Sequence, residues 1–458
     1  MPAKKTCDLL IKNAHLLTMD AKRTVHPSGA IAIRGDSIAA VGRSAALERD
    51  WSAARTIDAE GGLVHPGLID THYHTTYHMV GKMIAEVDFG GDDPGPWVAK
   101  QYLGMIDSLD DELEYSNALL LGLDMLKSGV TTVMDPGSAF EPECVKQASD
   151  SLGFRASVAD CYLMDERGPQ LSRFKRAKFG RAHALKTLGG QLWRNKDPKA
   201  KVRGHVAVYG MGNDSDVLRL AAKKAADKAG VAFNMHQSQS ADDAEHDDRR
   251  FGRHPLVHFE KIGLLGPNCV FVHMNVLRPD EYAPVKRAGM TVVWSPTNSW
   301  YYGARLHVKT PMPKLHKQGI NIAIGLDVSK AASFGDQMYT AYALARDQGE
   351  YVSPDDLLRM YTINGAKALR WHKWLGSLEA GKRADIVIRN SDAPEVWPRH
   401  NTVRQHVLLA KSRTVDTVIV DGEVLVKGGR LTRMDEGEVY ARADRAAKLM
   451  RKRAGISG

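Results

Sequence analysis

The sequence predicts an α/β protein in which a (β/α)8 TIM barrel is joined to a small β-sandwich domain built from both chain termini. Three observations support this fold class. The chain has 458 residues, enough for one large barrel and one smaller domain. Its middle part alternates strand-like and helix-like segments, which is typical of parallel strands joined by crossover helices. Short apolar runs separated by turn residues occur near both ends.

The β-sandwich is predicted from these terminal runs. Apolar, strand-like segments cover residues 8–13, 29–34 and 37–42, and similar segments occur at residues 384–388 and 415–422. One small domain assembled from both ends explains this pattern with the fewest elements.

The resulting domain division has three parts. We assign residues 1–62 and 371–435 to the discontinuous β-sandwich domain and residues 63–370 to the barrel. Residues 436–458 form a C-terminal segment, in which 436–453 reads as an amphipathic helix that packs on the protein surface.

The barrel is predicted from the number and spacing of strand candidates. Helical stretches, such as residues 113–128 and 217–229, lie between them. About eight strands over a span of about 300 residues favour a closed barrel over an open sheet. After the first strand, the candidates are residues 130–134, 155–158, 202–209, 231–235, 270–272, 291–294 and 320–324.

Composition and charge argue against membrane and nucleic-acid partners. The chain has no apolar run of about 18 residues and no signal-peptide core at its N-terminus. Its net charge of +9 is dispersed and accompanies no nucleic-acid-binding motif. The four cysteines match neither a zinc nor a disulfide spacing, which favours free thiols in the cytoplasm. We therefore expect a cytoplasmic protein whose partner is a small molecule.

Three histidines and an aspartate each follow a strand-like run: His72, His74, His236 and Asp327. Residues i and i+2 of a strand share a face, and barrel enzymes carry their catalytic groups at the C-terminal strand ends. Imidazole and carboxylate are ligands of zinc and similar cations. The pattern predicts one open site for one divalent metal ion, zinc first, with Fe2+, Co2+ or Mn2+ as alternatives.

Each of these residues also has a simpler explanation when taken alone. A pair of histidines two positions apart is common, and His236 by itself could be a hydrogen-bonded core residue. Asp327 could cap a helix, since Ser329 and Lys330 follow it. Their joint occurrence at strand ends favours the metal site.

Three motifs show that the chain resembles the amidohydrolase superfamily. They are residues 66–74 (PGLIDTHYH), 126–133 (LKSGVTTV) and 376–385 (GSLEAGKRAD). The resemblance covers essentially the whole chain. It implies a metal-bearing (β/α)8 barrel with a β-sandwich from both termini, and oligomerisation by analogy with relatives, which are usually homo-oligomers.

The resemblance also implies a single metal ion. Two-metal members carry a bridging lysine on strand 4, and the matching residues 203–211 contain none. The nearest branch is the mononuclear cytosine deaminase and triazine hydrolase group. By this resemblance the four residues named above are metal ligands, and His273 orients the water or oxyanion or acts as a fifth ligand.

The residue three positions after His236 departs from the family pattern. Deaminase-like members have a proton-shuttling glutamate there, whereas this chain has Gln239. Glutamine holds no titratable proton but still forms hydrogen bonds. Glu245, from the adjoining loop, is an alternative source of the carboxylate. The change disfavours ring deamination and favours carbonyl C–N cleavage, because the metal or His273 can polarise a carbonyl oxygen directly.

Among family members of this character, the chain most resembles bacterial phenylurea and molinate (thiocarbamate) hydrolases. The resemblance implies hydrolysis of an N-aryl urea, such as a phenylurea herbicide, to an aniline, with Asp327 as proton shuttle and Gln239 orienting the substrate. The alternatives are an aminohydrolase of a triazine or pyrimidine, a thiocarbamate hydrolase, and a catalytically inactive relative.

Two strand-following loops are expected to form the substrate pocket. The loop after strand 1 includes Trp97, and the loop after strand 7 contains Asn298, Trp300, Tyr301 and Tyr302. Consecutive aromatic residues can wall an aryl ring. Packing against a helix or a subunit interface is the alternative explanation for them.

Overall fold

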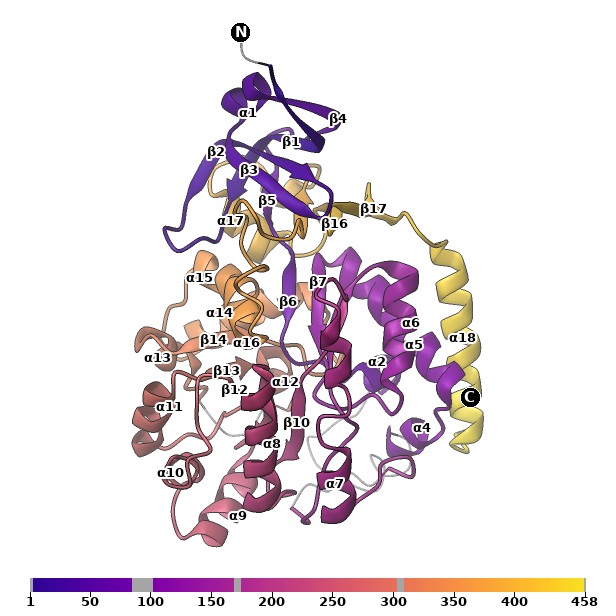
Figure 1. The fold of residues 1–458 in the computed structure, drawn as a ribbon, viewed down its shortest axis with the longest axis vertical. Helices are drawn as coiled ribbons and strands as arrows, with labels where there is room; N and C mark the ends of the chain where they lie inside the picture. The colour runs from indigo at the N-terminus through magenta and orange to yellow at the C-terminus, as the bar shows by residue number, and fades with distance from the viewer. Residues whose placement is uncertain (1–2, 85–101, 169–173, 303–308, 457–458) are drawn as a thin grey trace.

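The terminal sheet and the barrel lie one above the other along the long axis of the molecule (Figure 1). The structure is a computed structural model that describes residues 3–84, 102–168, 174–302 and 309–456. The sheet lies at the N-terminal end of this axis, the barrel lies below it, and the C-terminal helix runs along one side of the barrel.

Both ends of the chain contribute to one mixed sheet of nine strands. Its order is β18-β17-β16-β15-β5-β1-β2-β3, with β4 paired to β1. The strand β5 joins the two ends because it pairs with β1 in parallel and with β15 in antiparallel orientation. The sheet therefore extends to residue 66. The strand bounds are β1 (Lys5–Leu17), β2 (Val25–Arg34), β3 (Ser37–Arg43), β4 (Trp51–Asp58), β5 (Leu63–Pro66), β15 (Ile386–Arg389), β16 (Val415–Val420), β17 (Glu423–Lys427) and β18 (Arg430–Leu431).

The predicted barrel is confirmed. Its parallel strands form two groups, β6-β7-β8-β9 and β10-β11-β12-β13-β14. β9 and β10 are interrupted only at His205 and count as one strand, so the described residues form eight barrel strands. The strand bounds are β6 (Leu68–Asp70), β7 (Val130–Met134), β8 (Arg155–Val158), β9 (Val202–Gly204), β10 (Val206–Gly210), β11 (Phe233–Gln237), β12 (Cys269–His273), β13 (Thr291–Trp294) and β14 (Asn321–Ile324).

The first and last strands close the ring next to the candidate metal ligands. The backbone N–H of Thr71 donates to the carbonyl of Ile324 at 3.0 Å. Beyond this contact, Tyr73 and Asp327 pair as neighbours in a parallel ladder. The carboxylate of Asp70 adds a side-chain link, since it accepts hydrogen bonds from the N–H of Leu326 at 3.0 Å and the hydroxyl of Tyr361 at 2.8 Å.

Helices cover the outside of the barrel (Figure 1). The helix α5 begins after Asp110, whose side chain accepts the N–H of Leu113, and α8 begins after Ser215, which caps Leu218 in the same way. The main helix bounds are α1 (Ser44–Asp50), α2 (His78–Met83), α4 (Gly104–Asp107), α5 (Asp111–Lys127), α6 (Pro142–Leu152), α7 (Arg181–Thr187), α8 (Asp216–Ala229), α9 (Ala241–Phe251), α10 (Pro255–Lys261), α11 (Tyr282–Ala288), α12 (Pro296–Tyr302), α13 (Met312–Lys317), α14 (Gln337–Asp347), α15 (Pro354–Met360), α16 (Ile363–Ala368), α17 (Thr402–Arg404) and α18 (Glu436–Arg453).

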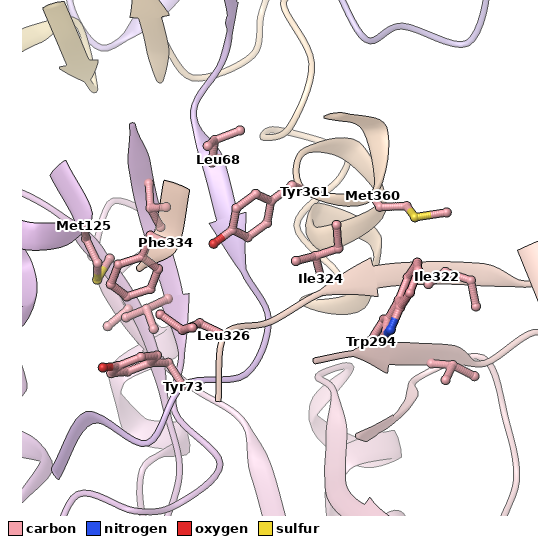
Figure 2. Close-up of a cluster of buried hydrophobic side chains, with 14 of the residues drawn as sticks. Leu68, Tyr73, Met125, Trp294, Ile322, Ile324, Leu326, Phe334, Met360 and Tyr361 are labelled. Atoms are coloured by element: carbon pink, nitrogen blue, oxygen red, sulfur yellow. The ribbon is translucent and has the colours of Figure 1, made fainter. Parts of the chain in front are cut away.

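A cluster of buried, mainly apolar side chains packs around the ends of the first and last barrel strands (Figure 2). Tyr73, between the two predicted histidine ligands, packs against Phe334 with ring centroids 5.0 Å apart. Ile324, at the end of the last strand, and Leu326, two positions later, lie in the same cluster and are buried. This packing fixes the chain on both sides of the metal-ligand positions, because buried side chains in close contact resist displacement.

Within the residues that the structure describes, no helix is both long enough and apolar enough to cross a membrane.

Candidate metal centre

Four candidate ligands converge at the C-terminal ends of the barrel strands. The Nε2 atoms of His72 and His74 lie 3.2 Å and 3.3 Å from Oδ1 of Asp327. The Nε2 atom of His74 also lies 3.1 Å from Nε2 of His236. All four side chains are buried. The structure therefore brings together the residues that the sequence predicts as metal ligands.

Backbone pairing between the first and last strands sets this geometry. The N–H of Asp327 donates to the carbonyl of His72 at 2.8 Å, and the N–H of His74 donates to the carbonyl of Asp327 at 2.9 Å. Gly325 makes the close approach possible, because a Cβ at that position would lie only 2.7 Å from the Cβ of His72.

Two of the functional side chains sit on strained backbone. Asp327 has φ 71° and His273 has φ 72°, which is the left-handed region that non-glycine residues rarely adopt. Such a conformation costs on the order of 1–3 kcal/mol and persists where the surrounding structure enforces it. Here it turns both side chains at the ends of their strands toward the shared cluster.

The ring nitrogens in this cluster fit a divalent cation. Nδ1 of His236 donates to the carbonyl of Tyr209 at 2.6 Å, which leaves a lone pair on the Nε2 that faces His74. Nε2 of His72 is buried and, although it lies 3.2 Å from Oδ1 of Asp327, it makes no hydrogen bond of favourable geometry among the described residues. Burial lowers the pKa of His72 and holds that of His236 well below its usual range, so both rings are neutral and able to bind a metal.

Asp327 supplies the negative charge of the centre. Burial alone would raise its pKa, but contacts with His72 and His74 hold the pKa of Asp327 well below its usual range. An ionised carboxylate beside neutral imidazoles is a donor set suited to zinc.

His273 completes the polar cluster. Its ring centroid lies 5.5 Å from that of His72 and 5.6 Å from that of His236. A ligand atom from each of these three histidines lies within 4.8 Å of the others. Burial lowers the pKa of His273 to about 3, so the ring is neutral and offers one N–H donor and one lone pair.

Gln239 is linked to Asp327 through one intermediate residue. Its Nε2 donates to Oδ1 of Asn298 at 3.4 Å, and Nδ2 of Asn298 donates to Oδ2 of Asp327. The alternative carboxylate, Glu245, lies on α9 with a side chain 59% exposed and pairs with Arg249 at 3.8 Å. Glu245 therefore does not supply a carboxylate to the centre.

The consecutive aromatic residues 300–302, expected to line the substrate pocket, lie on different faces of a helix. Residues 296–302, expected as a loop, form α12, because Pro296 is well placed in a first helical turn. Asn298 and Tyr302 are four positions apart and so share a face, whereas Trp300 is 60% exposed and borders a surface cavity of about 560 Å³. Tyr301 is half-buried, and Trp97 lies outside the described residues.

Two aromatic neighbours of the candidate ligands were not predicted from the sequence. The ring of Tyr77 stacks on His74 with centroids 4.8 Å apart and an interplanar angle of 5°. Tyr209, at the end of strand β10, lies 5.1 Å from the ring of His236. Both positions carry a usable signal, since Tyr77 follows His74 by three residues and Tyr209 ends a barrel strand.

Lys330 is a third residue that the analysis did not assign to the site. It follows Asp327 by three residues, its side chain is buried, and its Nζ donates to the hydroxyl of Tyr302 at 2.5 Å. Lysine is seldom fully buried, so its burial marks this position in the structure although the sequence does not reveal it.

Known proteins match this chain over nearly its full length. The model of the amidohydrolase family (Amidohydro_1) matches residues 63–425. A 5-methylthioadenosine/S-adenosylhomocysteine deaminase from Thermoanaerobacter pseudethanolicus is 27% identical, covering 97% of this chain and 100% of that protein.

Two solved structures share the fold. One is an adenosine deaminase from Xanthomonas campestris with bound zinc, at 22% identity and a TM-score of 0.86, covering 98% of this chain and 100% of the other. The second is an atrazine chlorohydrolase from Arthrobacter aurescens TC1 complexed with zinc, at 22% identity and a TM-score of 0.82, covering 96% of this chain and 100% of the other.

Proposed function

The chain belongs to the amidohydrolase family, and from this premise we propose that it uses one divalent cation, zinc first, to hydrolyse a C–N bond at a planar carbon of a small substrate. The convergence of His72, His74, His236 and Asp327 at the barrel mouth carries the proposal. Neutral imidazoles and one ionised carboxylate form a donor set that leaves a position for water.

Each residue of the centre has its own role in the proposed reaction. His72, His74, His236 and Asp327 would hold the cation, which when bound would supply a water with a pKa of about 7 and would polarise the group under attack. Asp327 accepts the proton of the attacking water and returns it to the departing nitrogen. His273, as a neutral ring, donates its N–H to the oxygen on which negative charge develops.

The first candidate substrate is an amino-substituted nitrogen heterocycle, from which hydrolysis would release ammonia. The relatives support it: several that cover most of this chain are named deaminases of adenosine-type compounds. The ring of Tyr77, stacked on His74, adds an aromatic surface beside the centre, which suits a flat ring.

The second candidate is a carbonyl C–N bond, as in an N-aryl urea, a carbamate or a thiocarbamate. Gln239 favours it, because an amide cannot protonate a ring nitrogen and a carbonyl carbon needs no such step. Paired through Asn298 to Asp327, Gln239 is placed to hydrogen-bond the carbonyl or the N–H of such a substrate.

Product analysis separates the two candidates. Zinc-reconstituted enzyme is assayed on 5′-deoxyadenosine, 5-methylthioadenosine and aminotriazines for ammonia, and on aryl ureas, anilides and thiocarbamates for the released amine. Ammonia from the first group supports the heterocycle, and an aryl or alkyl amine from the second supports the carbonyl bond. Fully metallated enzyme that is inactive on both groups would contradict the proposal. Assembly into a homo-oligomer, a cytoplasmic location and the absence of a nucleic-acid partner stay predictions.

A further inference from the structure

We propose that Lys330 binds a carboxylate group carried by the substrate, and so selects anionic substrates. The inference rests on the proposed function only in taking the barrel mouth as the substrate site. It is carried by the buried ammonium group of Lys330, which has no carboxylate partner within the part of the chain that the structure describes and lies near Asp327 of the candidate metal centre.

The side chain of Lys330 is held in place by two tyrosines of α12. Its Nζ donates a hydrogen bond to the hydroxyl of Tyr302 at 2.5 Å. The same Nζ lies 4.3 Å from the ring centroid of Tyr302 and 5.4 Å from that of Tyr301. These contacts stabilise the cation and fix its position, but neither tyrosine neutralises its charge.

Three other partly buried lysines each pair with a carboxylate. Lys127 pairs with Glu436 at 2.6 Å, Lys223 with Asp227 at 2.6 Å and Lys382 with Glu379 at 3.1 Å. Lys330 is only 8% exposed, yet no carboxylate of the described residues lies within 4.0 Å of its Nζ. A buried ammonium without a carboxylate partner among the described residues is costly, and this indicates a counter-ion that arrives with a ligand.

The charge balance at the barrel mouth also supports a substrate carboxylate at Lys330. Asp327 is the metal-ligand carboxylate three positions before Lys330, and a divalent cation bound by Asp327 would more than neutralise it. Lys330 would then add a further positive charge to a site that is already positive. A substrate with one carboxylate would restore the balance, and it would gain a charge-assisted hydrogen bond from an ammonium that has further protons to donate.

The helix α12 contacts both Asp327 and Lys330, so it sets the distance between the metal centre and the position proposed for the substrate carboxylate. Asn298 donates to Asp327, and Tyr302, one turn further along, accepts from Lys330. Four residues of helix advance by about 6 Å. A planar ring with its scissile nitrogen at the metal centre and its carboxylate on the opposite edge spans about this distance.

Binding of two aniline probes to zinc-reconstituted enzyme tests the proposal without turnover. The probes are 4-aminobenzoate and its uncharged counterpart 4-methylaniline, titrated by calorimetry into wild type and Lys330→Met. We expect the substitution to weaken 4-aminobenzoate binding by roughly 10- to 100-fold and to leave 4-methylaniline unchanged. Lys330→Arg, which keeps the charge, should retain most of the preference.

Lys411→Met is the matched control. Lys411 also lies over a tyrosine ring, 4.6 Å from that of Tyr339, but it is paired with Asp336 at 2.7 Å beside the surface cavity. Its replacement should not change the binding of either probe. Thermal unfolding without probe checks that both variants fold.

Three results would overturn the proposal. They are no preference of the wild type for 4-aminobenzoate, equal binding of that probe by wild type and Lys330→Met, and an equal loss of both probes in Lys330→Met, which would indicate a structural role. If no C–N substrate is turned over, the proposed function fails, but the binding comparison still decides the role of Lys330.

Discussion

The Nε2 atoms of His74 and His236 face each other at 3.1 Å, although the two residues are 162 positions apart in the chain. Because Nδ1 of His236 is committed to the carbonyl of Tyr209, its Nε2 presents a lone pair. Nε2 of His74 faces this lone pair and also lies 3.3 Å from Oδ1 of Asp327, and such a set of donor atoms fits a shared cation.

Replacing the carboxylate of the centre should stop the reaction. In Asp327→Asn the side chain can no longer carry a proton, so we expect kcat to fall by roughly 100-fold or more on whichever substrate is active. Steady-state kinetics at saturating zinc measures this. Asp347→Asn, at an exposed position of α14, is the control. Near-normal turnover of Asp327→Asn would show that another group carries the proton.

A carboxylate at position 239 should separate the two candidate reactions. Gln239→Glu supplies a second titratable group, so ammonia release from a heterocycle should rise by about tenfold or more, while carbonyl C–N hydrolysis should gain nothing. The measurement is kcat/KM against pH for both substrate classes, with Gln147→Glu on the outer helix α6 as the control for added charge. An unchanged ratio between the classes would show that position 239 does not act on proton transfer.

His205, where the fourth barrel strand is interrupted, should make the fold sensitive to acid. Burial lowers the pKa of His205 to about 4, although the charge of Asp135 opposes the shift. Between this value and the ordinary histidine pKa of about 6.5, the unfolded chain binds more protons, so stability is present above about pH 6.5 and is lost as the pH falls toward 4.

We therefore expect the wild type to lose on the order of 3 kcal/mol more unfolding free energy than His205→Gln between pH 7 and pH 4. Urea unfolding of metal-depleted protein measures the difference without a contribution from metal release. The control is His183→Gln, at a half-exposed position of α7, which should show the same pH dependence of the unfolding free energy as the wild type. Parallel pH profiles for the wild type and His205→Gln would contradict the assignment.

A buried ion pair should hold the barrel to the terminal sheet. Arg155 of β8 donates two hydrogen bonds to Asp385, at 2.7 Å and 2.9 Å, and both side chains are 2% exposed. Asp385→Asn leaves the guanidinium under-compensated, so we expect a loss of about 3 kcal/mol in unfolding free energy by urea titration. The exposed pair of Arg287 and Glu260 is the control, and Glu260→Gln should have little effect. Arg155 also pairs with a second carboxylate, that of Asp421. A comparably small effect of Asp385→Asn would show that Asp421 alone compensates Arg155.

Features with a local or periodic signal could be predicted from the sequence. The helix α18 has the predicted bounds, because Asp435 caps its first turn and the apolar period continues to its end. The positions of the candidate metal ligands could be predicted because each follows an apolar strand, and the C-terminal ends of parallel barrel strands meet at one face.

Contacts that depend on loop conformation could not be predicted. Gln239 reaches Asn298 across 59 positions after a turn in which Ser238 adopts φ 46°. Trp300 was grouped with Tyr302 because three aromatic residues follow one another, but in a helix only some positions of such a run share a face. The burial of Lys330 could not be predicted, because it depends on packing between segments that lie far apart in the sequence.

Metal analysis of the purified protein tests the central claim most directly. Mass spectrometry of wild type and His236→Ala, after removal of loosely bound ions, should find about one divalent cation per wild-type chain, mainly zinc, and little in the variant. His183→Ala should keep the wild-type content. An active wild-type enzyme without stoichiometric metal, or full metal content in a folded His236→Ala protein, would contradict the account.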